Sequence, residues 1–232
     1  MSLERKGSMR TFCIIPALNE ATRIQQVLNV ALACEQIDLV VVVDSCSQDN
    51  TANVARDMGA MVLYCQVPGK GEAVSLAVRE LAHDNDNILI LDADYTGLKQ
   101  EHLTNILGPV VCGEFIQSAG VIDSLPGRLY WRWHIGLTGA RAFKASLLWE
   151  IYELDYMGWA LETALNAICR WSPRRQKRPI AKTLLIGVSS TDKWTKYPTK
   201  GLALKAKLNC LLQWPLGTIR FNLAIKYKHW LT

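Results

Sequence analysis

The segment that most constrains the fold is Ile88-Leu89-Ile90-Leu91-Asp92-Ala93-Asp94, in which four consecutive aliphatic residues lead into two carboxylates one residue apart. Such an aliphatic run is typical of a strand buried on both faces, as in a parallel sheet. Open α/β sheets bind ligands at the carboxyl edge of their strands, where Asp92 and Asp94 would lie. Because neighbouring carboxylates repel each other, the pair favours a divalent cation such as Mg²⁺ or Mn²⁺. The alternative is a strand end that caps a helix beginning near Lys99.

Short apolar runs alternate with helical patterns through the first half of the chain, which indicates βαβ units. The expected strands before this one are 12–15, 39–43 and 60–64, and the expected helices are 20–34, 50–58 and 71–82. We expect Pro16 to stop the first strand, Asn19 to cap the first helix and Gly59 to end the second. The predicted fold class is therefore α/β, a mostly parallel nucleotide-binding sheet flanked by helices. Beyond Ser118 the pattern is less regular, and a further helix is expected at about 155–171.

Charge divides the chain unevenly. Residues 170–232 carry 14 Lys and Arg against one acid, net +13, whereas residues 1–169 carry 12 basic and 20 acidic residues, net −8. This split indicates an anionic partner for the C-terminal part, such as a membrane surface, a nucleic acid or a phosphorylated substrate. We expect a flexible N-terminus at 1–9, one domain at 10–198 and a basic amphipathic helical tail at 199–232. The tail would lie on a membrane surface or form a dimer contact, and Pro215 and its charges exclude a spanning helix.

The remaining composition points to the cytoplasm. Half of the residues are hydrophobic, and the seven cysteines are scattered without Cys-x-x-Cys spacing. They are typical of reduced core thiols in a cytosolic protein. No early apolar run is long enough for a signal peptide. We therefore expect a cytoplasmic protein, or one at the inner face of the membrane.

Polar motifs follow the four successive predicted strands. They are Pro16-Ala17-Leu18-Asn19-Glu20, Asp44 through Thr51, Pro68-Gly69-Lys70-Gly71, and Asp92-Ala93-Asp94. The carboxyl ends of parallel strands meet at one edge, so these groups would converge on one crevice. For each motif alone a structural explanation exists: an Asx turn with a helix cap for the second, and an ordinary glycine turn for the third.

Taken together, these motifs resemble an inverting family-two-type glycosyltransferase. Two later segments continue the resemblance, Thr138-Gly139-Ala140-Arg141-Ala142-Phe143 and Gly158-Trp159-Ala160-Leu161-Glu162-Thr163, so that it spans roughly residues 11–171. The resemblance implies a nucleotide-sugar-binding α/β fold of the A type, Mg²⁺ or Mn²⁺ on the donor diphosphate, and one carboxylate acting as a base. The donor partner is then a nucleotide diphosphate sugar.

The resemblance also implies roles for individual residues. The nucleotide-binding residues would be Pro16, Ala17, Asn19, Glu20, Asp44, Ser45, Lys70, Asp92 and Ala93. Asp94 would contact the metal directly, and Asp92 would reach it through water or lie nearer the ribose. Lys70, between two glycines, would approach the diphosphate or a base edge. Neither His134 nor His229 matches a further metal ligand, and the loop 187–200 has the composition of a lid over phosphates.

Two residues carry the predicted chemistry. Glu162 matches the acid of the Trp-x-x-Glu segment and would take the proton of the acceptor hydroxyl. The alternatives are a solvated helix carboxylate, or that Glu153 or Asp155 takes this role. Arg141 would bind an acceptor phosphate or the donor diphosphate. Its alternative is an exposed surface arginine.

The sequence therefore predicts metal-dependent, inverting transfer of a hexose to an acceptor of two possible kinds. A polyprenyl phosphate would account for the basic tail. A small phosphorylated acid would account for Asp44-Ser45-Cys46, which replaces the commoner Asp-Asp-Gly and resembles glucosyl-phosphoglycerate synthases. The alternative is a non-catalytic nucleotide or nucleic-acid binding module. Nucleic acid is not expected, because the basic residues are mixed with Leu and Trp and the pair at Asp92 would repel a phosphate backbone.

Overall fold

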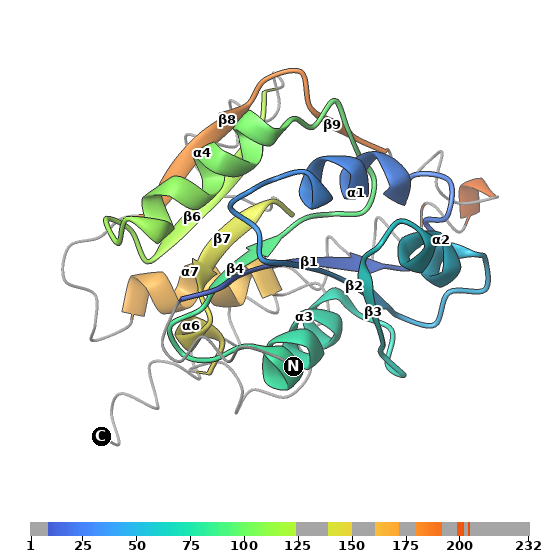
Figure 1. Cartoon of the computed structure of the whole chain (residues 1–232), viewed down its shortest axis with the longest axis horizontal. Helices are drawn as coiled ribbons and strands as arrows, with labels where there is room; N and C mark the ends of the chain where they lie inside the picture. The colour runs from blue at the N-terminus through green and yellow to red at the C-terminus, as the bar shows by residue number, and fades with distance from the viewer. Residues whose placement is uncertain are drawn as a thin grey trace, which may run out of the picture.

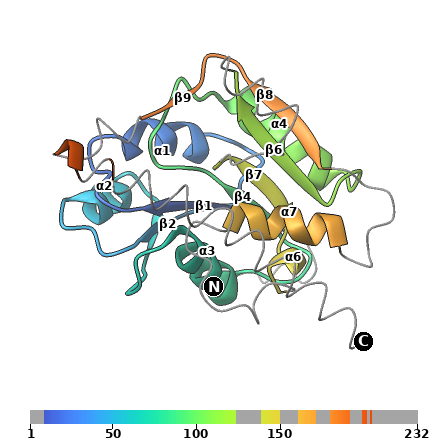
Figure 2. The same cartoon turned by 180° about the vertical axis from the view of Figure 1, so that it is seen from behind.

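The fold was established from a computed structural model, which describes residues 9–123, 139–149, 161–171, 180–191, 199–201 and 204. A central sheet is covered by helices on both faces, giving three layers (Figures 1 and 2). The four strands predicted from the sequence all belong to this sheet. The predicted α/β class is confirmed.

The sheet has seven strands in the order β3-β2-β1-β4-β7-β6-β8, and β5 and β9 pair separately. The strands are β1 (Thr11–Ala17), β2 (Leu39–Asp44), β3 (Met61–Tyr64), β4 (Asn87–Ile90), β5 (Tyr95–Thr96), β6 (Gln117–Ile122), β7 (Arg141–Lys144), β8 (Ala181–Leu185) and β9 (Ser189–Ser190). Strand β7 runs antiparallel to both β4 and β6, and the other pairs of the large sheet are parallel. The chain order reverses at β1, because β2 and β4 pair on its two sides, so a crevice is expected at its carboxyl end.

The described helices are α1 (Ile24–Leu32), α2 (Thr51–Asp57), α3 (Lys70–Leu81), α4 (Gln100–Val111), α6 (Ser146–Trp149) and α7 (Leu161–Trp171). Alternation along the central strands divides the core into two parts. Phe12 and Ile14 of β1 face a cluster that includes α3, α6 and α7. Cys13 and Ile15 face the opposite cluster, which includes α1, α2 and α4. Both faces of β1, β2 and β4 are thus buried, as the aliphatic runs predict.

The first strand and helix differ from the prediction. Pro16 does not stop β1, which continues to Ala17. The pairing of β1 with β4 ends at Ile14, two residues before Pro16. On that side of β1 the sheet therefore does not need the N–H group that proline lacks. Asn19 does not cap a helix, because α1 begins only at Ile24 with Arg23 as its N-cap. Instead Asn19 lies in the loop after β1 with a positive φ of 56°. Its side chain accepts a hydrogen bond from the Gln48 N–H.

Other boundaries agree more closely with the sequence. Gly59 follows α2 with a φ of 97°, the left-handed conformation that favours glycine. Asp92 and Asp94 do not cap the next helix, because Lys99 is the N-cap of α4 and β5 intervenes. The side chains of five cysteines are described, and these five are free thiols. Cys46 and Cys112 are exposed, so the prediction of core thiols is wrong for these two.

Several predictions fall outside the described residues. These are the N-terminal segment 1–8, His134, residues 192–198 of the 187–200 loop, nearly all of the tail with His229, Glu153 and Asp155. Among the residues that the structure describes, no helix is long and apolar enough to cross a membrane.

Candidate active site

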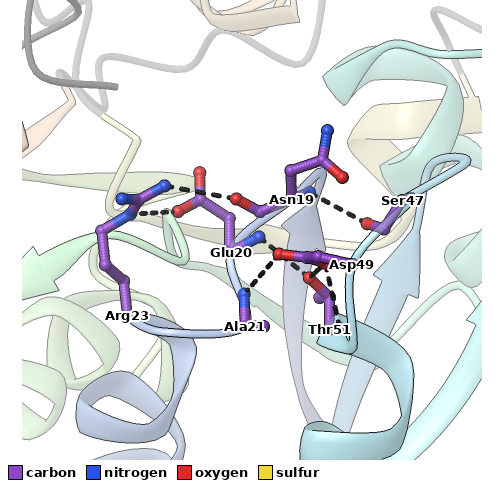
Figure 3. Close-up of polar contacts among 7 residues, drawn as sticks. All are labelled: Asn19, Glu20, Ala21, Arg23, Ser47, Asp49 and Thr51. Atoms are coloured by element: carbon purple, nitrogen blue, oxygen red, sulfur yellow. Dashed lines mark hydrogen bonds and ion pairs between the residues drawn. The ribbon is translucent and has the colours of Figure 1, made fainter. Parts of the chain in front are cut away.

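The loops that follow β1 and β2 bind each other side by side (Figure 3). The backbone N–H of Asn19 donates to Ser47 Oγ at 2.9 Å, and Gln48 N–H donates to Asn19 Oδ1 at 2.8 Å. Glu20 N–H donates to Thr51 Oγ1 at 2.9 Å. Each loop thus supplies hydrogen-bond acceptors for the backbone of the other, which fixes the shape of this edge of the sheet.

Two acidic side chains complete this pair of loops. Asp49 accepts from the N–H groups of Ala21 and Thr51 at 3.1 and 3.0 Å and also from the Thr51 hydroxyl. Partial burial alone would raise the pKa of Asp49, but these hydrogen bonds outweigh it and the pKa is lowered. Glu20 is buried, and its Oε2 accepts from Arg23 Nε at 2.6 Å. The two loops are therefore held in place by hydrogen bonds within the chain.

Asp44 ends β2 beneath these loops. Its Oδ1 accepts from the Ser47 N–H at 2.7 Å, and its carbonyl accepts from Cys65 N–H at 2.8 Å. The Asx turn weighed as an alternative for this segment is present at Asp49, whose Oδ1 accepts from the N–H of Thr51 two residues on. Ser45 is also buried and donates its N–H to the Ala17 carbonyl at 2.9 Å. Cys46 adopts a φ of 67°, a conformation that the glycine of the commoner pattern takes without strain.

Lys70 joins two carboxylates that are distant in sequence. Its Nζ lies 2.6 Å from Asp92 Oδ1 at the end of β4 and 2.8 Å from Glu162 Oε1 on α7. The side chains of Lys70 and Glu162 are only 12% and 11% exposed, whereas that of Asp92 is 35% exposed. Glu162 is therefore not the solvated helix carboxylate of the alternative interpretation.

The charge of Lys70 follows from these neighbours. Burial by itself lowers the pKa of an ammonium group, but the charges of Asp92 and Glu162, with a smaller effect from Tyr95, outweigh burial and raise the pKa of Lys70. Lys70 is therefore a cation at any physiological pH. It begins α3, so the positive end of this helix lies beside the same ammonium group.

Gly139 closes one side of Asp92. A Cβ atom built on Gly139 would overlap Cγ and both carboxylate oxygens of Asp92. Only glycine allows the backbone before β7 to pass this close to the end of β4. The glycine of the Thr138-Gly139 turn therefore shapes the Asp92 side of the site, a role that only the folded structure reveals.

The residues after Asp92 continue toward β5. Asp94 is half-buried, Ala93 and Tyr95 are buried, and β5 pairs with β9. Thr96 Oγ1 and Ser189 Oγ lie 2.6 Å apart, which ties the segment after Asp94 to the start of the predicted lid loop. Among the described residues no group of three or more His, Cys, Asp or Glu could hold a metal ion. Two strand-end carboxylates nonetheless fit Mg²⁺ or Mn²⁺ that takes its other ligands from diphosphate and water.

Arg141 is 1% exposed and is among the largest fully buried side chains. Its Nη1 donates to Asn166 Oδ1 of α7 at 2.8 Å. The alternative of an exposed surface arginine is therefore wrong. The direct phosphate contact that the resemblance implies stays a prediction.

The structure thus brings Lys70, Asp92 and Glu162 together and joins the Pro16–Glu20 loop to the loop after Asp44. Sequence reasoning missed Gly139 beside Asp92 and Asn166 beside Arg141. For Gly139 the available signal is its place in the Thr138-Gly139-Ala140-Arg141 segment, but its contact with Asp92 depends on how β7 passes β4. For Asn166 the available signal is a polar residue four positions after Glu162, which places both on one helix face.

A nucleotide-sugar-binding sheet with its polar strand ends gathered in this way is the A-type glycosyltransferase architecture that the motifs resemble. The chain belongs to glycosyl transferase family 2, whose family model matches residues 12–175. It is therefore a glycosyltransferase. No curated protein matches the sequence.

Solved structures share the fold. Glucosyl-3-phosphoglycerate synthase from Mycobacterium tuberculosis in complex with Mn²⁺, uridine-diphosphate-glucose and phosphoglyceric acid has a TM-score of 0.72 and 19% identity, covering 95% of this chain and 80% of that chain. The complex with Mg²⁺ and uridine-diphosphate has a TM-score of 0.72 and 20% identity, covering 95% and 80%. The complex with Mn²⁺, uridine-diphosphate and phosphoglyceric acid has a TM-score of 0.72 and 20% identity, covering 95% and 79%. At this identity the likeness shows the fold.

Proposed function

We propose that this protein transfers a hexose from a nucleotide diphosphate sugar, with Mg²⁺ or Mn²⁺, to the hydroxyl of a small phosphorylated acid. The observation that carries the proposal is the ion pairing of Lys70 with both Asp92 and Glu162. The side chain of Lys70 comes from the third strand-end motif, Asp92 from the fourth and Glu162 from the helix of the last motif. Their convergence joins the predicted donor site to the predicted base.

The donor nucleotide would lie against the joined loops. Asn19, Glu20 and Asp44 would hold the base and ribose, and Pro16, Ala17 and Ser45 would supply the wall beneath them. Their mutual hydrogen bonds support this assignment, because a site fixed before binding loses less entropy when the ligand arrives. Lys70 would then exchange part of its contact with the carboxylates for the donor diphosphate.

Asp94, with Asp92 beside it and Ala93 between them, would hold the metal ion. The bound ion supplies a positive charge that offsets the negative charge developing on the departing nucleotide diphosphate. Lys70 contributes a fixed cation to the same region, since the pKa of its ammonium is raised. The chain's own residues thus provide charge stabilisation that does not depend on pH near neutrality.

Glu162 would accept the proton of the attacking hydroxyl. Its Oε1 lies against Lys70, which ties the base to the donor side of the site. A base on the acceptor side and a single displacement would invert the anomeric configuration. An acceptor phosphate would be attracted by the excess of basic residues in 170–232.

The small phosphorylated acid is preferred over a polyprenyl phosphate on two grounds. The Asp44-Ser45-Cys46 segment departs from the commoner Asp-Asp-Gly pattern and resembles glucosyl-phosphoglycerate synthases. Two of the structural neighbours were solved with phosphoglyceric acid. The predicted tail that would favour lipid lies almost wholly outside the described residues.

The test is a transfer assay with the purified full chain. UDP-, GDP-, ADP- and TDP-hexoses are each incubated with 3-phosphoglycerate, glycerol 3-phosphate or a short polyprenyl phosphate, and products are identified by mass spectrometry. We expect one donor to give a hexosyl phosphoglycerate, with the rate lost in EDTA and restored by Mn²⁺ or Mg²⁺. Product on the lipid alone would overturn the proposed acceptor, and nucleic-acid binding without donor binding would overturn the enzymatic proposal.

The stereochemical part has its own measurement. The coupling constant of the anomeric proton in the isolated product gives its configuration relative to the donor. Inversion would support Glu162 as the base of a single displacement. Retention would refute that role while leaving the donor and metal assignments in place.

A further inference from the structure

We propose that Arg141 is a positioning residue, which acts through Asn166 to fix the place of α7 and thereby the distance between Glu162 and Lys70. This inference rests on the proposed role of Glu162. It assigns the buried side chain of Arg141 a role in supporting α7.

The first step is the burial of the guanidinium group. A charge that is 1% exposed is costly unless its donors are satisfied by well-placed acceptors. Nη1 of Arg141 donates to Asn166 Oδ1 at 2.8 Å. Gln117 on β6, with its amide oxygen turned toward Arg141, accepts from the same nitrogen and donates to the Leu165 carbonyl at 3.3 Å. Three elements, β6, β7 and α7, therefore meet through this one side chain.

The second step is the geometry of α7. Asn166 lies four residues after Glu162, so both side chains project from the same face of the helix, one turn apart. Apolar contacts of Leu161, Ala164 and Leu165 hold α7 against the core. Apolar packing alone tolerates small rotations and shifts, whereas a planar guanidinium satisfies its acceptors in one orientation. The Arg141–Asn166 hydrogen bond therefore selects the rotation of α7 that places Glu162 Oε1 2.8 Å from Lys70 Nζ.

The third step connects Arg141 to the other carboxylate. Gly139, two residues before it, lies directly against Asp92. The segment 139–141 thus contacts Asp92 through backbone and supports Glu162 through Arg141 and Asn166. The positions of Asp92 and Glu162 thus both depend on segment 139–141. A change in this segment is therefore expected to alter both ion pairs of Lys70.

The experiment compares two substitutions at one position. Asn166→Leu keeps the size of the side chain and removes the acceptor, whereas Asn166→Asp keeps an acceptor for Arg141. We expect Asn166→Leu to lower kcat by about tenfold to a hundredfold with the donor KM within about twofold, because the donor loops are unaffected. Asn166→Asp is expected to retain at least about half of the wild-type kcat, since a carboxylate accepts the same hydrogen bond.

A matched control separates positioning from general stability. Val110 is buried in α4 on the opposite face of the sheet, and Val110→Ala destabilises the core without touching the network. It is expected to leave kcat per folded molecule unchanged. Arg141→Met is a second variant that removes the donor side of the same hydrogen bond. Combined with Asn166→Leu it should lower kcat no further than either change alone.

Hydrogen exchange measured by mass spectrometry supplies a readout that needs no turnover. Amides of 161–171 should exchange about tenfold faster in Asn166→Leu, and not in Asn166→Asp or Val110→Ala. Unchanged exchange and kcat in Asn166→Leu, or an equal loss of kcat in Val110→Ala, would overturn the positioning role. If the wild type transfers no hexose, the proposed function fails and the exchange comparison still decides whether Arg141 and Asn166 fix α7.

Discussion

The contact between Gly139 and Asp92 gives the sharpest test of the site. A Cβ at Gly139 would overlap Cγ and both oxygens of Asp92, so in Gly139→Ala the carboxylate must move by more than about 1 Å. Such a movement breaks the 2.6 Å contact between Asp92 and Lys70. Misplacing a positioned group by about 1 Å costs on the order of 100-fold in rate. We therefore expect kcat to fall about 100-fold.

The cost in stability should be small by comparison. The Asp92 side chain is 35% exposed, so water can replace the lost hydrogen bond. We expect the free energy of unfolding to fall by about 1 kcal/mol, which lowers Tm by roughly 2–4 °C in a chain of this size. A large loss of rate with a small loss of stability distinguishes a misplaced carboxylate from a damaged fold.

Gly108→Ala is the matched control. Gly108 lies inside α4, and a Cβ there meets nothing within 4 Å. Alanine in a helix interior is favoured over glycine by about 1 kcal/mol, so this variant should be slightly more stable and fully active. Transfer rates, urea unfolding and UDP titration with Mn²⁺ are measured on all three proteins. Wild-type kcat in Gly139→Ala would refute the reasoning.

Three further changes test the rest of the site. In Glu162→Gln the amide oxygen still accepts from Lys70, so Tm should change little while kcat falls about 10²- to 10⁴-fold; a rate near wild type would exclude Glu162 as the base. In Lys70→Met two carboxylates lose the cation between them, and the free energy of unfolding in urea should drop by about 2–3 kcal/mol; no change would mean that solvent already screens the pair. The pKa of Asp49 is lowered in the folded state, so its contribution is present above about pH 4 and is lost as pH falls through the lowered pKa. The stability difference between wild type and Asp49→Asn should accordingly be constant from pH 8 to 5 and shrink below about pH 4, and a difference that persists at pH 3 would contradict this assignment.

The order of the first elements could be predicted from the sequence because period and burial are local signals. Four aliphatic runs gave four strands of the sheet, and the polar motifs after them lie at its carboxyl edge. That β1 continues through Pro16 could not be predicted, because it depends on where β4 stops beside β1. Asn19 was misassigned because its side chain binds the Gln48 N–H of another loop, a partner 29 residues away.

In the candidate site, too, some residues could be identified from local motifs, whereas the role of another depends on the fold. Lys70, Asp92 and Glu162 could be chosen by motif, and their contacts agree with one site. Arg141 shows the limit of this reasoning. Its position after Gly139 is compatible with a surface, a phosphate contact or the interior, and the antiparallel placement of β7 between β4 and β6 excludes only the exposed surface.

The two halves of the site differ in how their side chains are held. The loops after β1 and β2 are joined by hydrogen bonds between backbone N–H groups and the uncharged side chains of Asn19, Ser47 and Thr51. A nucleotide that binds against these loops need not displace them. Lys70, Asp92 and Glu162 satisfy one another instead, and an arriving diphosphate must compete for the ammonium group. A lysine held by two carboxylates avoids an uncompensated buried charge. Two of its three N–H donors are given to Asp92 and Glu162, and the third can turn toward phosphate. Donor binding would thus release Glu162 from part of its ion pair at the moment when the acceptor needs a base.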